Sequence, residues 1–177
     1  MGASQIRIKP GSASSVDNVE EVRKALHEEI EIKCFYEGAS TLLLGDQTVT
    51  VGAGDVVVIN PFEFHATVDR GEEGNQGKYH IFMVPLDFFS GTNLPELDLR
   101  ALVFGQKRLF RNCFFQDQQL HNILMVAARE YTDAQVAWEA SVYGLLLEFF
   151  AQLVRRGVRE TSFDAIGNET MRAYRVI

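Results

Sequence analysis

The sequence predicts a mainly β domain, in which a small antiparallel barrel is followed by an antiparallel pair of helices. Before residue 115, short runs rich in β-branched residues alternate with turns that contain Gly, Asp, Asn or Pro, as in sandwiches and barrels. After that point the apolar residues recur in steps of three and four, which is typical of helices. The 177 residues, 46% of them hydrophobic, suffice for one core and a small appended unit.

Residues 1–24 are interpreted as a polar N-terminal arm with a short helical possibility from Val16 to Ala25, and residues 25–116 as the barrel. Gly45-Asp46 predicts a two-residue hairpin turn, and Pro61 should end a strand because it has no N–H to donate to the ladder. We expect strands at 29–36, 40–45, 47–52, 55–60, 64–70 and 78–86, and a further strand around 108–115.

Residues 117–160 are predicted to form the helical pair. Asp117 is expected to cap a helix that runs to Tyr131, and Asp133 a longer helix that runs to Arg156. The apolar stripe of the second helix is wider than a bare coiled-coil seam. Either one side packs on the barrel and the other on a second copy of the chain, or the hairpin is purely intramolecular. A homodimer through 134–156 would use Trp138, Ala140, Tyr143, Leu147, Phe150 and Val154.

Composition and motifs exclude several classes of function. The net charge of -7 makes this chain alone a poor nucleic-acid binder, because phosphate contacts need clustered Lys and Arg. We find no apolar run long enough for a membrane span, and no signal core, so we expect no membrane contact and a cytoplasmic location. Cys34 and Cys113 are expected to be reduced core thiols. No nucleophile, phosphate-loop or HExxH motif is present.

The candidate ligand-binding residues lie between positions 27 and 65. His27, Glu31 and His65 are spread over two strand-like runs, and a barrel can bring such side chains together in its lumen. If Glu31 points inward, strand alternation also places Lys33 and Phe35 inward. A buried Glu31–Lys33 pair needs partners or a ligand. We therefore hypothesise that these groups bind a small polar effector, with Phe35 as a stacking face.

Other interpretations of the same residues stay open. His27 and Glu31 would also fit a structural contact at the start of a strand, and His65 would also fit the barrel rim. The strand that carries His80 is apolar on both faces, so either His80 and Phe82 or Tyr79, Ile81 and Met83 face the lumen. We include His80 among the candidate ligand-binding residues.

Two motifs carry a family resemblance. The spacing His27-x3-Glu31-x6-Gly38 is similar to the latter part of the first cupin motif, and Gly54-x10-His65 is similar to the second. The run from Gly54 to His65, which reads GDVVVINPFEFH, resembles the N-terminal effector-binding domain of AraC-type transcription regulators. The resemblance implies a cupin-like double-stranded β-helix, or jelly-roll barrel, followed by the helical pair.

The resemblance also implies a function. The chain would be the effector-sensing and dimerisation domain of a regulator, binding a small metabolite such as a sugar, without a cofactor and without enzymatic activity. DNA would be bound only through a C-terminal domain that this chain lacks. Residues 161–177 would then be a linker and the start of the missing helix-turn-helix domain.

The alternative is a stand-alone metal-dependent cupin enzyme, an isomerase or a dioxygenase. Metal-binding cupins usually begin the first motif with two histidines, which here would be residues 25 and 27, but position 25 is Ala25. A set of two His and one carboxylate can still hold iron. If a metal is bound, its ligands would be His27, Glu31 and His65.

Overall fold

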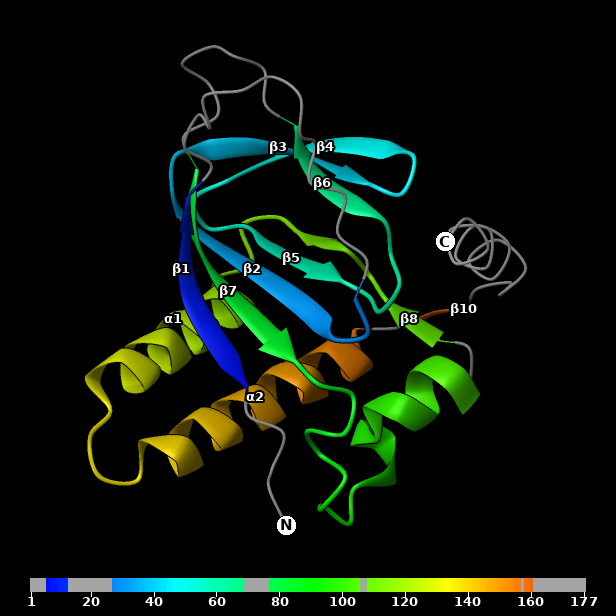
Figure 1. The fold of residues 1–177 in the computed structure, drawn as a ribbon, viewed down its shortest axis with the longest axis vertical. Coiled ribbons are helices and arrows are strands. Elements are labelled where there is room, and N and C mark those ends of the chain that lie inside the picture. Colours follow the sequence, from blue (N-terminus) through cyan, green and yellow to red (C-terminus); the bar gives the residue numbers. More distant parts are fainter. Residues whose placement is uncertain (1–5, 13–26, 69–76, 106–107, 157, 161–177) are drawn as a thin grey trace, which may run out of the picture.

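The computed structural model describes residues 6–12, 27–68, 77–105, 108–156 and 158–160 (Figure 1). The short helix expected within 16–25 and the linker expected within 161–177 lie outside these residues. Two sheets and two long helices make up most of the described chain.

One sheet has five strands in the order β1-β7-β2-β5-β9 and another has three strands in the order β4-β3-β6, while β10 pairs with β8 alone. All strand pairs are antiparallel. The strands are β1 (Arg7–Ser12), β2 (Ile30–Glu37), β3 (Ala39–Leu44), β4 (Gln47–Gly52), β5 (Val56–Ile59), β6 (His65–Val68), β7 (Lys78–Val84), β8 (Arg108–Phe110), β9 (Cys113–Phe114) and β10 (Val158–Glu160).

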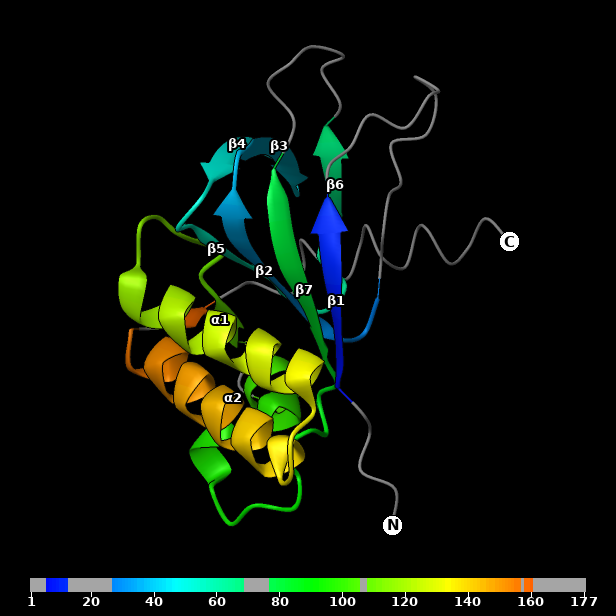
Figure 2. The ribbon, with the colours of Figure 1, turned by 90° about the vertical axis from the view of Figure 1, so that its left-hand side faces the viewer.

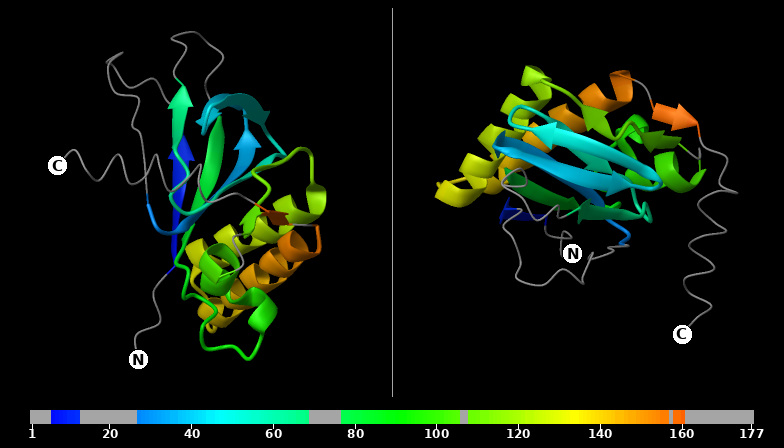
Figure 3. Two further views of the ribbon diagram at one scale, coloured as in Figure 1. Left: turned by 90° about the vertical axis from the view of Figure 1, so that its right-hand side faces the viewer. Right: turned by 90° about the horizontal axis from the view of Figure 1, so that it is seen from above.

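The elements form three layers, with the five-stranded sheet in the middle (Figures 1 and 2). The helices α1 (Gln118–Asp133) and α2 (Trp138–Arg155) run antiparallel and cover one face of this sheet. The three-stranded sheet lies over the other face, as the view from above also shows (Figure 3). Side chains of both sheets fill the space between them, and this interior of the barrel is called the lumen below.

Each layer boundary has its own core. The core between the central sheet and the helices is largely apolar and includes Ile32, Phe82 and Phe150. The smaller core inside the lumen contains Phe35 and Tyr79. Because side chains alternate along a strand, each central strand contributes to both cores.

The fold class predicted from the sequence is confirmed, and all six strands expected between residues 29 and 86 form. Gly45, at a φ of 61°, makes the predicted two-residue turn between Leu44 and Gln47. The strand expected around 108–115 is interrupted, and its two parts, β8 and β9, pair with different partners.

The structure adds three features to the prediction, one of which is strand β10 at residues 158–160, a range expected to belong to the helical pair. Residues 7–12 of the arm form strand β1 on the free edge of β7, although their sequence is polar. The segment between β7 and β8 contains a short 3-10 helix, Pro95–Leu97, and one π-helical turn, Ala101–Gly105. Periodicity does not reveal elements of this length.

Of the two capping residues predicted from the sequence, one caps its helix and the other does not. Asp117 caps α1 as predicted, because its side chain accepts a hydrogen bond from the Leu120 N–H. Asp133 does not cap α2 but ends α1, and α2 begins after Ala137, which has a φ of 66° and gives no side-chain cap. The apolar contacts of α2 therefore decide its start more than a capping residue does.

No helix in the described ranges is long and apolar enough to cross a membrane.

Candidate ligand-binding site

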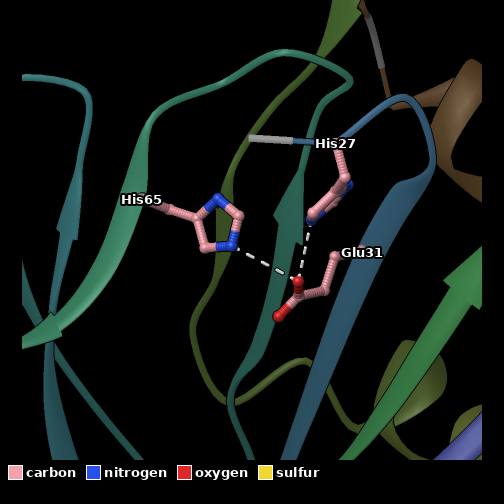
Figure 4. A group of neighbouring side chains, drawn as sticks. All are labelled: His27, Glu31 and His65. Carbon is pink, nitrogen blue, oxygen red and sulfur yellow. Dashed lines mark hydrogen bonds and ion pairs between the residues drawn. The ribbon is translucent and has the colours of Figure 1, made fainter. Parts of the chain in front are cut away.

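Three side chains from separate elements meet at one end of the lumen (Figure 4). Glu31 lies on β2, His27 lies just before this strand, and His65 is the first residue of β6. Their ligand atoms all lie within 4.8 Å of one another. The convergence of these three residues that the sequence predicted is therefore present.

The backbone around His65 explains its position. Phe62 has a φ of 59° and turns the chain between β5 and β6, while its N–H donates to the His27 carbonyl at 2.9 Å. The Glu63 carboxylate accepts hydrogen bonds from the backbone N–H and the side chain of Asn60 and from the Asn112 side chain. The loop that carries His65 is thus fixed by hydrogen bonds to Asn60, directly after β5, and to Asn112, directly before β9.

Glu31 is the centre of the cluster. Its Oε2 lies 2.9 Å from His27 Nε2 and 3.3 Å from His65 Nε2, and its Oε1 lies 3.3 Å from Lys33 Nζ. The residues are buried, with 7% of Glu31, 5% of Lys33 and 4% of His65 exposed. The buried carboxylate is thereby compensated by three nitrogen-bearing partners, as burial of a charge requires.

Lys33 has a second contact besides Glu31. Its Nζ lies 5.3 Å from the centroid of the Tyr79 ring, within the range of a cation–π interaction. The Phe35 ring packs against Tyr79 with centroids 4.8 Å apart. Alternation along β2 thus places Glu31, Lys33 and Phe35 on the lumen face, in agreement with the sequence prediction.

Both histidines are oriented by backbone carbonyls. His27 Nδ1 lies 2.9 Å from the Glu29 carbonyl, and His65 Nδ1 lies 3.0 Å from the Glu63 carbonyl. A carbonyl only accepts, so each Nδ1 carries the proton that it donates. The Nε2 atoms consequently face Glu31, either as lone pairs in the neutral rings or as donors in the protonated rings.

The cluster also shifts the ionisation of its members. Burial alone would raise the pKa of Glu31, but hydrogen bonds from His27 and His65 and the charge of Lys33 hold it well below its usual range. Burial alone would lower the pKa of His27, but its hydrogen bond to Glu31 and the charge of this carboxylate raise it. Glu31 is therefore ionised, and it favours the protonated form of His27.

Besides Ser40, which lies opposite Val51 in the register of β3 and β4, the rest of the lumen wall is mostly apolar. Its buried members come from both sheets, so a molecule held here would contact a charged cluster at one end and hydrocarbon along its sides. The wall contains Phe35, Leu42, Leu44, Val51, Val57, Ile59 and Tyr79.

His80 is not part of this cluster, which corrects the candidate set. In the register of β7 it lies opposite Cys34, on the face that packs against the helices. Its ring stacks on Tyr36 with centroids 4.8 Å apart. Of the two alternatives for this strand, Tyr79, Ile81 and Met83 face the lumen, because they share a face with Phe35, Lys33 and Glu31.

Phe150 is likewise corrected as a candidate interface residue. It is fully buried and packs edge to face against Phe89, Phe110 and Phe149, so it belongs to the core. The other five candidates, Trp138, Ala140, Tyr143, Leu147 and Val154, are half-buried or exposed in the single chain.

A hollow of about 340 Å³ lies between α2 and residues 94–97 of the segment that connects β7 to β8. Its apolar side consists of the side chains of Leu94, Leu97, Leu147, Ala151 and Val154. Glu148 and Arg155 lie at its edge. The residues of the Glu31 cluster do not line this hollow.

One contribution to the lumen was not expected from the sequence. Gly11 of β1 lies opposite Tyr79 of β7, and a Cβ atom at Gly11 would come within 2.5 Å of Tyr79 Cε2. The missing side chain therefore leaves room for the ring that covers Lys33. The sequence signal was a lone glycine next to Pro10 in a polar arm, which does not identify a partner strand.

The donor set fits a divalent transition metal. Two imidazoles and one carboxylate are common ligands of iron and zinc, and hydrogen bonds from Nδ1 to backbone carbonyls are the usual outer support of metal-binding histidines. The Lys33 ammonium group lies 3.3 Å from the other oxygen of the same carboxylate.

The chain was compared with models of known protein families. The model of the AraC-like ligand binding domain matches residues 17–150, which include the whole Glu31 cluster and most of α2. No curated protein sequence matches the chain.

Among solved structures, the chain is similar to the apo form of a ToxT variant from Vibrio cholerae strain SCE256, with a TM-score of 0.55 and 15% identity. This match covers 91% of the present chain but 61% of ToxT, so the chain spans about three fifths of that protein. At this identity the likeness concerns the fold alone.

Cupin barrels give weaker matches. A cupin 2 conserved barrel domain protein from Salinispora arenicola CNS-205 is 16% identical, with a TM-score of 0.34 over 47% of this chain and 80% of that one. A single-residue mutant of Bacillus subtilis oxalate decarboxylase OxdC is 16% identical, with a TM-score of 0.31 over 48% of this chain and 25% of that one.

Proposed function

The chain belongs to the family of AraC-like ligand-binding domains, and from this premise we propose that it senses a small molecule for a transcription regulator. The observation that carries the proposal is a buried cluster of paired charges, enclosed by a mostly apolar barrel wall. Buried charges cost free energy unless they are paired, so their presence in a lumen favours a role in recognition.

We propose a small polar metabolite, such as a sugar, as the effector. Glu31, His65 and Lys33 offer hydrogen-bonding groups at one end of the lumen, and the Phe35–Tyr79 pair offers an aromatic face. Small-molecule sites typically combine an apolar or aromatic wall with a few polar groups that fix the orientation of the ligand. Because the cluster is closed by its own contacts, the effector would replace some of them.

The signal would leave the lumen through strand β1, which pairs with β7 next to a side chain of the lumen. Strand β1 of the arm lies beside β7, and Gly11 contacts the Tyr79 ring. A ligand that moves Tyr79 would therefore also move β1. In this proposal the change is passed to a DNA-binding domain in the cytoplasm, and a coupling of about 1–3 kcal/mol is sufficient.

Dimerisation would use the exposed side of α2. Leu147, Ala151 and Val154 line the hollow beside this helix, and Glu148 and Arg155 lie seven residues apart at its edge. In an antiparallel pair of α2 helices, Glu148 of one copy can meet Arg155 of the other. We expect sedimentation to detect a dimer that Leu147→Glu weakens, and a monomer at high concentration would contradict this part of the proposal.

The effector proposal is tested by a thermal-shift screen with monosaccharides, organic acids and amino acids, followed by calorimetric titration of each hit. Glu31→Ala should weaken a true effector by at least tenfold, since it removes the centre of the cluster. Glu37→Ala is the matched control, because Glu37 lies at the other end of β2 with an exposed side chain. Unchanged affinity in Glu31→Ala would refute the site.

A metal-dependent enzyme is the second candidate, favoured by the donor set of His27, Glu31 and His65. Metal analysis of protein purified without chelator separates the two functions. Stoichiometric Fe, Mn, Ni or Zn that is lost in His65→Ala would favour the enzyme. An effector that binds metal-free protein would favour the sensor.

A further inference from the structure

The His27–Glu31–His65 cluster is organised for a cation. Hydrogen bonds from both Nδ1 atoms to carbonyls direct both Nε2 atoms toward the same carboxylate oxygen, Glu31 Oε2. In their neutral forms the two rings would present lone pairs to an oxygen that also carries lone pairs. These facing lone pairs repel each other unless a proton on an imidazole ring, or a metal ion between the Nε2 atoms and Glu31 Oε2, lies between them.

Lys33 already supplies a cation at the same carboxylate. Its Nζ lies 3.3 Å from Glu31 Oε1, and its side chain is 7% exposed. The Tyr79 ring on the other side holds the ammonium group in place. The Lys33 charge is therefore fixed inside the lumen, where water screens it little.

We propose that Lys33 is a tethered cation that keeps divalent metal ions out of the His27–Glu31–His65 cluster. A metal ion bound to these three residues would lie beside an ammonium group that shares its carboxylate ligand. Like charges this close in a buried site repel strongly, so Lys33 lowers the affinity for metal although the donor atoms fit one.

This inference deepens the proposed function, because it gives the reason why a lumen with three metal-type ligands would be kept for an organic effector. Lys33 would then be the residue that determines specificity between the two classes of ligand. Its test needs no effector, so it can fail while the sensing proposal stands.

The experiment titrates Co²⁺ into the metal-free chain and follows the visible absorption of the bound ion, with Zn²⁺ as competitor. We expect Lys33→Met to raise the Co²⁺ affinity at least tenfold over the unsubstituted chain, since it removes the repelling charge and keeps an apolar contact with Tyr79. The double variant Lys33→Met/His65→Ala should lose this gain, because one ligand is missing.

Lys78→Met is the matched control. Lys78 lies on the neighbouring strand β7 and is ion-paired with Glu37, but its side chain is exposed. The Co²⁺ affinity of this variant should equal that of the unsubstituted chain. If Lys33→Met does not fold, Lys33→Gln keeps a hydrogen-bond donor for Glu31 without the charge and is expected to show the same gain.

Three results would overturn the inference. The first is a Co²⁺ affinity of the unsubstituted chain equal to that of the Lys33 variants. The second is a gain that survives the loss of His65. The third needs no Lys33 variant, because tight Co²⁺ binding by the unsubstituted chain that His65→Ala abolishes would show that Lys33 does not exclude metal.

Discussion

The two faces of strand β2 differ in chemistry although their residues alternate along one chain. Ile30, Ile32 and Cys34 face the helices and are completely buried in an apolar core. Glu31 and Lys33 face the lumen and are almost as buried, yet they carry charges. The helix side thus contributes stability through apolar burial, whereas the lumen side keeps groups whose burial is unfavourable unless they are paired.

The difference indicates where function lies. Apolar residues such as Ile32 would fill the lumen with less desolvation cost than a charged cluster does. The lumen instead holds four polar side chains at one end, namely His27, Glu31, Lys33 and His65. We therefore expect substitutions on the helix side to change stability and substitutions on the lumen side to change both stability and recognition.

The largest effect is expected on the helix side. Phe150→Ala removes a fully buried ring that packs against three other aromatic rings. It should lower the free energy of unfolding by about 3–5 kcal/mol in urea titrations. Leu147→Ala, on the half-exposed side of the same helix, is the control and should cost less than half as much. A loss below about 1 kcal/mol for Phe150→Ala would contradict the assignment of α2 to the core.

A smaller loss is expected at the charged centre of the lumen. Glu31→Gln leaves Lys33 buried without its counter-ion and should lower the free energy of unfolding by about 3 kcal/mol. Adding Lys33→Met should recover part of this loss, which a double-mutant cycle measures. Glu37→Gln, at the exposed end of β2, should cost under about 1 kcal/mol. Strict additivity of the Glu31 and Lys33 substitutions would show that they do not form a pair.

A still smaller loss of stability is expected where Gly11 of β1 packs beside the Tyr79 ring. A methyl group at Gly11 would come too close to the Tyr79 ring, so Gly11→Ala should cost about 1–3 kcal/mol of unfolding free energy. The near-ultraviolet circular dichroism should change as well, because the Tyr79 ring must move. Lys9→Ala, an exposed position on the same strand, is the control. Equal behaviour of the two variants would argue against packing of β1 over Tyr79.

The smallest effect is expected in the pH dependence of stability, through His80 on the helix side of the central sheet. Burial, together with the nearby charge of His121, lowers the pKa of His80 from its usual 6.5. The unfolded chain therefore binds a proton at His80 more readily, and stability is lost as the pH falls below about 6.5. Between pH 7.5 and 5.5, the free energy of unfolding of His80→Gln should fall by roughly a few tenths of a kcal/mol less than that of the unsubstituted chain. Identical pH profiles in urea unfolding would contradict this.

Much of the fold follows from local pattern. The alternation along 29–60, the Gly45-Asp46 turn and the Asp117 cap each depend on neighbouring residues, and all three are present in the structure. The start of α2 was misplaced because Asp133 has the chemistry of a cap but lies where α1 ends. Capping preference is worth about 1 kcal/mol, which packing between two helices easily exceeds.

Part of the candidate site could be predicted because it also depends on local pattern. Residues 31, 33 and 35 lie on one face of one strand, so their shared orientation is a local property. His80 was uncertain because its strand is apolar on both faces and alternation gives no preference. The register of β7 against β2, which places His80 opposite Cys34, arises from contacts between distant segments.

The sequence by itself determined the strands between residues 29 and 86, the two long helices, the family motifs and the alternation that places Glu31, Lys33 and Phe35 on one face. These depend on side-chain period and turn chemistry within a few residues. Only the tertiary structure decided that His65 and His27 share one oxygen of Glu31, that Lys33 takes the other oxygen, and that Gly11 lies over Tyr79. Such contacts join residues far apart in the chain, and their geometry is set by the packing of two sheets and two helices together.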